Sequence, residues 1–272
     1  MANLAGKTVF ITGGSRGIGL EIGLRAARDG ANVVIAAKTA EPHAKLPGTI
    51  HTAAEEIQEA GGQALAIQMD IRDELQVHSA IDKAVQAFGG IDVLVNNASA
   101  IQLTSVQDTA LKQYDLMMDC NARGSFIASK AAIPHLRKAE NPHILTLSPP
   151  INLNHRWLAA HSAYTLSKYG MSIIAMGLAE ELRRDGIAVN GLWPRTVILT
   201  SALNHTPGVD KKNVRRPEIM ADAAYHIITR PSREQTGELL IDENVLRRAG
   251  ETDFNQYAID PNEALLSDLF ID

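Results

Sequence analysis

Seven short apolar runs, separated by helical patterns, constrain the fold of this chain more than any other feature. The runs are nearly continuous in Val, Ile, Leu and Ala, without the alternation of polar and apolar residues typical of a half-exposed strand. Such runs indicate strands buried on both faces, and their alternation with helices favours a parallel sheet built by right-handed crossovers. The runs cover residues 7–13, 32–38, 64–70, 91–97, 143–148, 187–194 and 237–243. The sequence therefore predicts an α/β fold, a doubly wound parallel sheet of seven strands with helices on both faces.

Composition narrows the class of protein further. The 272 residues are 45% hydrophobic, enough for one large core, and we expect a single domain over residues 1–272. A net charge of −5 argues against a nucleic-acid partner, and the single cysteine, Cys120, allows no internal disulfide and is expected to be a buried thiol. The N-terminus carries no long apolar stretch, so we expect no membrane span and a cytoplasmic location. The nine histidines show no metal-ligand spacing, so we expect no metal.

Residues at the ends of the predicted strands are turn formers and hydrogen-bonding groups. In open α/β sheets, ligands bind at the carboxyl ends of the strands, so these residues are expected to converge on one edge. They are Gly13, Lys38, Asp70, Asn96, Asn97, Ser148 and Pro194.

The first strand leads into the stretch TGGSRGIG at residues 12–19. Gly13, Gly17 and Gly19 allow a tight turn whose backbone can approach a pyrophosphate, which then lies at the N-terminus of the following helix. A glycine loop alone is a weak signal, but here it follows a strand and opens a helix. The stretch therefore predicts a dinucleotide site on a Rossmann-type domain.

The charges near this loop favour NADP over NAD. An NAD site usually carries Asp or Glu at the end of its second strand, whereas this run ends in Lys38, and Arg16 lies inside the glycine loop. Two cations beside the adenosine ribose suit a 2′-phosphate. The alternative is that both are solvated surface charges.

Tyr164 and Lys168 are four residues apart in the stretch YTLSK, and thus share a helix face. A cation beside a phenol lowers the pKa of the phenol, which could then exchange a proton with an alcohol or carbonyl oxygen. Ser148, at the end of the fifth strand, could hydrogen-bond the same oxygen. The neighbouring Tyr169 cannot share that face and is interpreted as a packing residue.

Five motifs together, TGGSRGIG, NNAS, CNARGSF, LTLS and YTLSK, resemble the short-chain dehydrogenase/reductase family over about residues 6–248. The resemblance implies hydride transfer with nicotinamide, and a homodimer or homotetramer. It implies a catalytic set of Asn121, Ser148, Tyr164 and Lys168, in which Asn121 holds a water. Asp70 would contact the adenine edge, Asn97 and Ala98 the adenosine, and Thr196 the carboxamide. The expected cofactor contacts are Gly13, Ser15, Arg16, Gly17, Ile18, Gly19, Lys38, Asp70, Ile71, Asn97, Ala98, Tyr164, Lys168, Pro194 and Thr196.

A narrower set of stretches, including LSPPINLN and GLWPRT, resembles the hydroxysteroid dehydrogenase-like group within that family. Three departures from the usual family pattern concern the substrate side. Ser99 stands where the family has glycine in NNAG, Arg195 stands in place of another glycine, and Pro149–Pro150 must loop out after the fifth strand.

Three segments have less certain roles. Residues 199–218 occupy the place of the family's substrate lid, with cations at 211, 212, 215 and 216 that are either solvated or meet an anionic tail such as that of a CoA ester. The loop 39–51 could clamp adenosine or form a subunit contact, and residues 249–272 form a C-terminal tail.

We therefore expect an NADP-dependent oxidoreductase that interconverts an alcohol and a carbonyl on a medium-sized apolar molecule, lipid-, terpenoid- or steroid-like. The alternatives are a reductase of fatty acyl thioesters and a non-catalytic protein that senses NADP on the same fold.

Overall fold

Seven parallel strands form one sheet in a computed structural model that describes residues 3–43, 46–201, 203 and 208–272. The strand order is β3-β2-β1-β4-β5-β6-β7, and every neighbouring pair is parallel. The strands are β1 (Thr8–Thr12), β2 (Asn32–Ala37), β3 (Gln63–Gln68), β4 (Val93–Asn96), β5 (His143–Thr146), β6 (Ala188–Trp193) and β7 (Leu239–Ile241). All seven predicted strands are present, and the doubly wound fold is confirmed.

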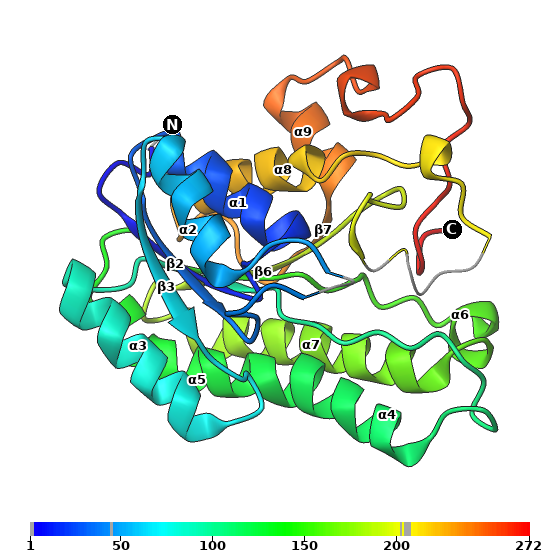
Figure 1. Cartoon of the computed structure of the whole chain (residues 1–272), viewed down its shortest axis with the longest axis horizontal. Coiled ribbons are helices and arrows are strands. Elements are labelled where there is room, and N and C mark those ends of the chain that lie inside the picture. Colours follow the sequence, from blue (N-terminus) through cyan, green and yellow to red (C-terminus); the bar gives the residue numbers. More distant parts are fainter. Residues whose placement is uncertain (1–2, 44–45, 202, 204–207) are drawn as a thin grey trace.

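Helices cover both faces of the sheet (Figure 1). One face carries α1 (Gly17–Ala27), α2 (Ile50–Glu59), α8 (Glu218–Ile228) and α9 (Asp242–Ala249). The other carries α3 (Glu74–Phe88), α4 (Leu111–Met117), α5 (Gly124–Leu136) and α7 (Ser162–Glu181), with the short α6 (His155–Ala159) before α7. A π-helical turn, η1 (Met118–Arg123), joins α4 to α5, and two 3₁₀ turns, η3 (Lys211–Asn213) and η4 (Asn255–Tyr257), lie near the C-terminal end.

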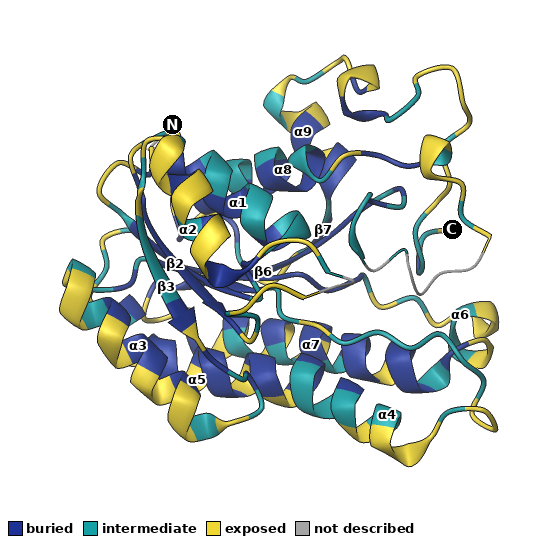
Figure 2. Ribbon diagram, viewed as in Figure 1, coloured by how far each residue is buried: buried dark blue, intermediate teal, exposed yellow. Residues whose placement is uncertain are grey.

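Two apolar clusters hold the helical layers against the sheet. Ile11 and Val33 face α1, α2 and α8, whereas Phe10 and Val34, their neighbours along β1 and β2, face α3 and α5. Consecutive strand residues point to opposite faces, which explains why the strands read as continuous apolar runs. Figure 2 shows the result, with the central strands buried and the long helices buried along the side that packs on the sheet.

Local signals set the helix boundaries. The Asp73 side chain accepts hydrogen bonds from Leu75 N and Gln76 N and so caps α3, and Thr49 caps α2 in the same way. Gly89 ends α3 with a φ of 84°, a left-handed conformation that favours glycine. Across the described residues, no helix combines the length and apolarity needed to cross a membrane.

Candidate active site

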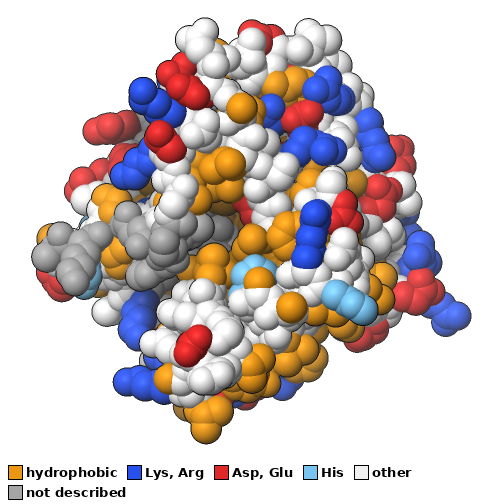
Figure 3. Space-filling view, turned by 90° about the vertical axis from the view of Figure 1, so that its right-hand side faces the viewer, with side chains coloured by type: hydrophobic (Ala, Val, Ile, Leu, Met, Phe, Trp, Pro, Cys, Tyr) orange, Lys and Arg blue, Asp and Glu red, His pale blue; other side chains and the backbone are white. Residues whose placement is uncertain are grey.

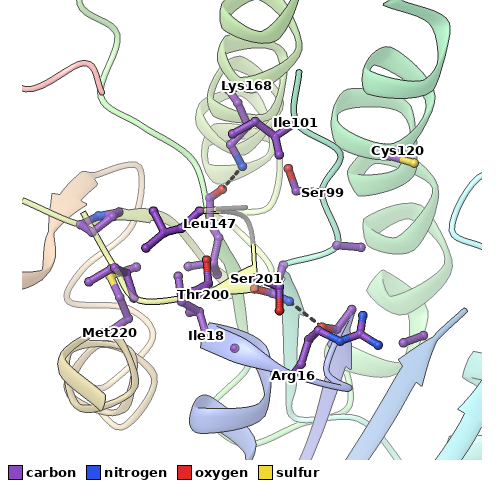
Figure 4. Close-up of a pocket in the computed structure, with 18 of the residues that line it drawn as sticks. Arg16, Ile18, Ser99, Ile101, Cys120, Leu147, Lys168, Thr200, Ser201 and Met220 are labelled. Atoms are coloured by element: carbon purple, nitrogen blue, oxygen red, sulfur yellow. Dashed lines mark hydrogen bonds between the residues drawn. The ribbon is translucent and has the colours of Figure 1, made fainter. Parts of the chain in front are cut away.

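A cleft of about 670 Å³ opens at the carboxyl edge of the sheet. The strand-end residues Gly13, Lys38, Asp70, Asn97 and Pro194 all line it, as the topology predicts. Figure 4 places Lys168 on one side of the cleft and Arg16 on the opposite side. Thirteen of the expected cofactor contacts line the cleft, whereas Gly19 and Thr196 do not.

The glycine turn is packed so closely that side chains could not be added. A Cβ on Gly13, whose φ is 69°, would lie 2.9 Å from Ala98 Cα, and one on Gly19 would lie 2.4 Å from Asn97 Nδ2. Asn97 Nδ2 in turn donates to Thr12 O and Gly13 O, both at 3.0 Å. Gly19 therefore does not line the cleft, but it lets Asn97 hold the turn in place.

Arg16 connects the glycine turn to the loop that follows β2. Its Nε donates to Pro47 O at 2.7 Å and its Nη2 to Gly48 O at 3.0 Å. This contact places residues 47–48 of the loop 39–51 over the glycine turn. Residues 44–45 of the same loop lie outside the described part of the chain.

Three charged side chains meet beyond the end of β2. Arg72 donates to both carboxylate oxygens of Asp70, with Nη2 to Oδ2 at 2.6 Å, and Lys38 Nζ lies 3.4 Å from the same Oδ2. The hydrogen bonds from Arg72 hold the pKa of Asp70 well below its usual range. Arg72 lines the cleft although sequence reasoning did not single it out, since nothing local distinguishes it from a solvated arginine.

Cys120 lines the cleft on this side and is only partly buried, which corrects the expectation of a buried thiol. Burial raises the pKa of the thiol, so the neutral form is favoured.

Tyr164 and Lys168 both line the cleft from α7 and are buried, with 5% and 3% of their surfaces exposed. Lys168 Nζ donates to Leu147 O at 2.7 Å and approaches Met171 Sδ at 3.5 Å, as Figure 4 shows for Leu147. Within the described residues, the Tyr164 hydroxyl makes no hydrogen bond, to Lys168 or to any other group.

The expected lowering of the Tyr164 pKa by Lys168 is wrong for this geometry. Burial raises the pKa of Tyr164, and the charge of Asp268 raises it further. Burial also lowers the pKa of Lys168 to about 7, opposed by the attraction of Asp268. The phenol is therefore protonated at neutral pH.

Two buried hydroxyls beside the cleft have no partner among the described residues. Ser148 Oγ follows β5 and is fully buried, and Thr196 Oγ1 follows β6 and is 7% exposed. Neither residue lines the cleft directly. A buried hydroxyl without a partner calls for an explanation, and a bound molecule that hydrogen-bonds it is one.

Asn121 lies within the π-helical turn η1 and is completely buried. Its Nδ2 donates to Ala100 O and Ser167 Oγ, both at 2.9 Å, and its Oδ1 accepts from Ala100 N at 2.7 Å. The side chain thus joins residue 100, beside the cleft, to α7. Both amide hydrogens of Asn121 are donated to protein groups, so its side chain has no free N–H to offer a water. The expected water-holding role of Asn121 stays a prediction.

Tyr169 packs away from the cleft, at 7% exposure, and its hydroxyl donates to Asn152 O at 2.5 Å. It therefore holds the loop after β5, which ends at Thr146, and Pro149–Pro150 lie in that loop as predicted.

The walls of the cleft away from the glycine turn are apolar, and sequence reasoning missed most of them. They come from distant parts of the chain and carry no recognisable motif. Figure 3 shows hydrophobic side chains gathered in the middle of the face that carries α6 and residues 264–272. The apolar lining includes Ile101, Leu103, Leu116, Trp193, Val197, Met220, Leu266 and Leu269.

The basic run at 211–216 is not one surface patch. Arg215 is 6% exposed, and its Nη1 lies 2.6 Å from Glu243 Oε2, so it is a structural ion pair. Lys211, Lys212 and Arg216 remain exposed. This finding corrects the inclusion of Arg215 among groups available to an anionic tail.

Comparison with known proteins identifies close relatives. The model of the short chain dehydrogenase family matches residues 7–207. Hydroxysteroid dehydrogenase-like protein 2 of Danio rerio is 57% identical over 270 residues, covering 99% of this chain and 65% of that protein, so this chain spans less than two thirds of the relative's length. A crystal structure of a Xanthomonas campestris protein is 58% identical, with a TM-score of 0.98 and 99% of each chain covered. A metagenomic short-chain oxidoreductase in complex with NADP is 26% identical, with a TM-score of 0.73, covering 88% of this chain and 97% of the other.

Proposed function

Because this chain belongs to the short-chain dehydrogenase family, we propose that it is an NADP-dependent oxidoreductase that interconverts an alcohol and a carbonyl on a medium-sized apolar molecule. The observation that carries the proposal is one shared cleft. Tyr164 and Lys168 open onto the same cavity as the glycine turn and the cations Arg16 and Lys38.

The residues present fit a nicotinamide dinucleotide. Gly13 and Gly17 leave backbone open to the cleft at the glycine turn, and α1 begins there at Gly17, so the N-terminal partial charge of α1 faces an anion bound at the turn. The unpartnered hydroxyls of Ser148 and Thr196 lie near the opposite end of the cleft. When bound, the cofactor supplies or accepts a hydride.

Tyr164 is the proposed proton donor. Its phenol is protonated at neutral pH and is proposed to give that proton to a substrate oxygen during carbonyl reduction, which leaves a phenolate. Lys168 carries the positive charge closest to it on α7. Lys168 can stabilise the phenolate left behind through its charge, while one of its N–H groups stays on Leu147 O. Ser148 Oγ, without a partner, is the proposed second donor to the substrate oxygen.

The preference for NADP rests on the charges at the adenosine end. Lys38 and Arg72 pair with one carboxylate, Asp70, and Arg16 also lines this end, whereas the described residues that line it include no second acidic group. The resulting positive balance suits a 2′-phosphate better than a free hydroxyl.

Residues 199–218 are the proposed substrate lid. Leu199 N bonds Arg215 O at 2.8 Å and Arg215 N bonds Val197 O at 2.9 Å, so the described ends of the segment are anchored together. Between them, Thr200, Ser201, Leu203 and Val209 line the cleft, while residues 202 and 204–207 lie outside the described part. The apolar walls on this side favour a substrate without charge.

A homo-oligomer through α5 and α7 is also proposed. Phe126 on α5 is 53% exposed, and Leu166, Ile173 and Met176 on α7 are 52%, 63% and 48% exposed. Exposed large apolar side chains on adjacent helices favour a protein interface. Light scattering should show a dimer or tetramer that dissociates in Ile173→Glu, and a monomeric wild type would contradict this part.

NADPH consumption across a panel of aldehydes, ketones and acyl-CoA thioesters tests the function. We expect turnover with medium-sized apolar carbonyls and slower turnover with NADH. Tight NADPH binding without turnover on any substrate would favour the non-catalytic alternative, and turnover confined to acyl-CoA would favour the thioester reductase.

A further inference from the structure

Lys168 is a buried ammonium without an ion pair. Only 3% of its surface is exposed, and among the described residues no carboxylate oxygen lies within 4.0 Å of its Nζ. Nζ donates to Leu147 O at 2.7 Å and approaches Met171 Sδ at 3.5 Å (Figure 4). A buried charge is costly unless polar groups replace the water that it has lost. One carbonyl oxygen and one weak sulfur acceptor replace little of that water.

A further contact to Lys168 comes from the indole ring of Trp193. Lys168 Nζ lies over the ring, 5.1 Å from its centroid, which is within the reach of a cation–π contact. Trp193 ends β6, is 7% exposed and lines the cleft together with Lys168 and Tyr164. The face of an indole carries the negative part of the ring quadrupole, so it attracts an ammonium most strongly where water is excluded. The contact therefore favours the protonated form of Lys168.

The C-terminal segment, residues 264–272, holds the orientation of this ring. Trp193 Nε1 donates to Leu269 O at 2.9 Å, which fixes one edge of the indole. The segment is held in turn to the chain that follows β6, where Val197 N donates to Leu266 O at 2.9 Å. Because the indole is tied at its nitrogen, its face stays turned toward the ammonium.

Phe270 anchors the segment among aromatic rings. It is 1% exposed, and its ring centroid lies 5.8 Å from those of both Trp157 and Trp193. Phe270 has a φ of 69°, uncommon for a residue other than glycine, so the packing outweighs a local backbone cost. The two tryptophans thus share one neighbour at the same distance, but Lys168 lies over Trp193 whereas Arg156 lies over Trp157.

Two titratable groups besides the ring surround Lys168. Asp268, in the C-terminal segment, attracts its charge without forming an ion pair, and Tyr164 lies one turn away on α7. Burial lowers the pKa of Lys168 to about 7, and the attraction of Asp268 opposes that shift. The pKa of this lysine therefore lies close to neutral, where a contact that favours the ammonium changes how much of Lys168 is charged.

We propose that Trp193 is a positioning residue of the active site, whose ring face holds the ammonium of Lys168 in the cleft and whose Nε1 ties that ring to the C-terminal segment. The inference rests on the proposed function and adds a residue to it. Trp193 neither gives nor takes a proton. It acts through Lys168, because the ammonium held on the ring stabilises the phenolate that Tyr164 leaves when it donates its proton.

The first test measures the Lys168 pKa without cofactor. Lysines labelled with ¹³C at Cε are titrated by NMR in the folded protein, and the Lys168 signal is assigned by its loss in Lys168→Met. Trp193→Phe and Trp193→Leu both lose the Nε1 hydrogen bond and both leave space, but Trp193→Phe keeps an aromatic face. The Lys168 pKa should be about one unit lower in Trp193→Leu than in Trp193→Phe.

Trp157→Leu is the matched control for this titration. It removes the other indole that packs on Phe270 at 5.8 Å, which lies under Arg156 instead of Lys168. It should lower the free energy of unfolding without moving the Lys168 pKa. Equal Lys168 pKa values in Trp193→Phe and Trp193→Leu, or the same shift in Trp157→Leu, would overturn the proposal.

Fluorinated tryptophan gives a second measurement that keeps the packing of the ring. The chain contains two tryptophans, so in Trp157→Phe the remaining indole is that of Trp193. Incorporation of 5-fluorotryptophan into this variant withdraws electrons from the ring face with little change of shape. The Lys168 pKa should fall by a few tenths of a unit, and an unchanged pKa would count against the contact.

The third test measures NADPH-dependent reduction against pH. The alkaline limb of the kcat profile, where Lys168 loses its proton, should lie at lower pH in Trp193→Leu than in Trp193→Phe and stay in place in Trp157→Leu. A loss of packing alone would lower kcat or raise KM without moving this limb, and that outcome would contradict the proposal. Failure of the proposed function looks different, because the wild type would then show no NADPH turnover while the NMR titration still reports on Trp193.

Discussion

The two halves of the cleft are built in different ways. The nucleotide half, formed by the glycine turn and the ends of β1 to β4, comes from short stretches in which neighbouring residues carry the signal. The substrate half, formed by the ends of β5 and β6, α7 and residues 266–269, is closed by a segment about a hundred residues beyond Tyr164. Local motifs thus determine where the cofactor would lie, whereas long-range packing determines what surrounds the proposed proton donor.

The largest expected effect comes from a substitution that disrupts packing in the substrate half and leaves the nucleotide half unchanged. Phe270→Ala removes a buried ring that packs against Tyr169, Trp157 and Trp193, and should lower the free energy of unfolding by about 3–5 kcal/mol. It should raise KM for carbonyl substrates while NADPH affinity changes little. Leu266→Ala, in the same segment but 39% exposed, is the control and should cost far less. If urea unfolding shows equal losses of unfolding free energy in the two variants, the Phe270 ring does not have the anchoring role assigned to it.

The next prediction concerns the pH dependence of folding stability, which we expect to arise from a histidine outside the cleft. His143 lies at the start of β5, away from the cleft, and burial lowers its pKa from 6.5 to about 4. His143 binds a proton more readily in the unfolded chain than in the folded protein. The free energy of unfolding should therefore fall by about 3 kcal/mol as the pH is lowered from 6.5 through 4. Urea unfolding of His143→Gln should show a weaker loss over the same range. An identical pH slope in the variant and the wild type would be inconsistent with this account.

The next effect concerns the nucleotide half. Gly19→Ala places a Cβ 2.4 Å from Asn97 Nδ2, displacing the side chain that holds the glycine turn. We expect a loss of about 1–3 kcal/mol of stability, with weaker NADPH binding by calorimetry. Gly177→Ala in α7, where an added Cβ meets nothing within 4 Å, should be neutral or stabilising. Unchanged NADPH binding in Gly19→Ala would show that the turn tolerates the displacement.

The smallest effect tests cofactor choice. Lys38 is 72% exposed, so Lys38→Asp should leave the fold intact and shift the ratio of NADPH to NADH affinity toward NADH by roughly ten- to a hundredfold. Lys83→Asp, on an exposed part of α3, serves as the control. A ratio unchanged by Lys38→Asp would remove Lys38 from the proposed 2′-phosphate site.

The fold was predictable because five of the seven strands, β1, β2, β4, β5 and β6, are buried along their whole length and therefore have clear apolar runs. The placement of Gly13, Lys38, Asp70 and Pro194 at one edge followed from parallel topology alone. The direction of the Tyr164 pKa shift was not predictable, because it depends on burial and on Asp268, which no local pattern connects to α7. The prediction that Arg215 is available to an anionic tail was wrong for the same reason, since its partner Glu243 is distant in sequence.

Turnover of Tyr164→Phe at saturating NADPH tests the central claim most directly, that a buried phenol beside the cofactor cleft supplies the proton. With a carbonyl that the wild type reduces, the account predicts a loss of roughly 10²- to 10⁴-fold in kcat and unchanged NADPH affinity. Turnover equal to that of the wild type would contradict it.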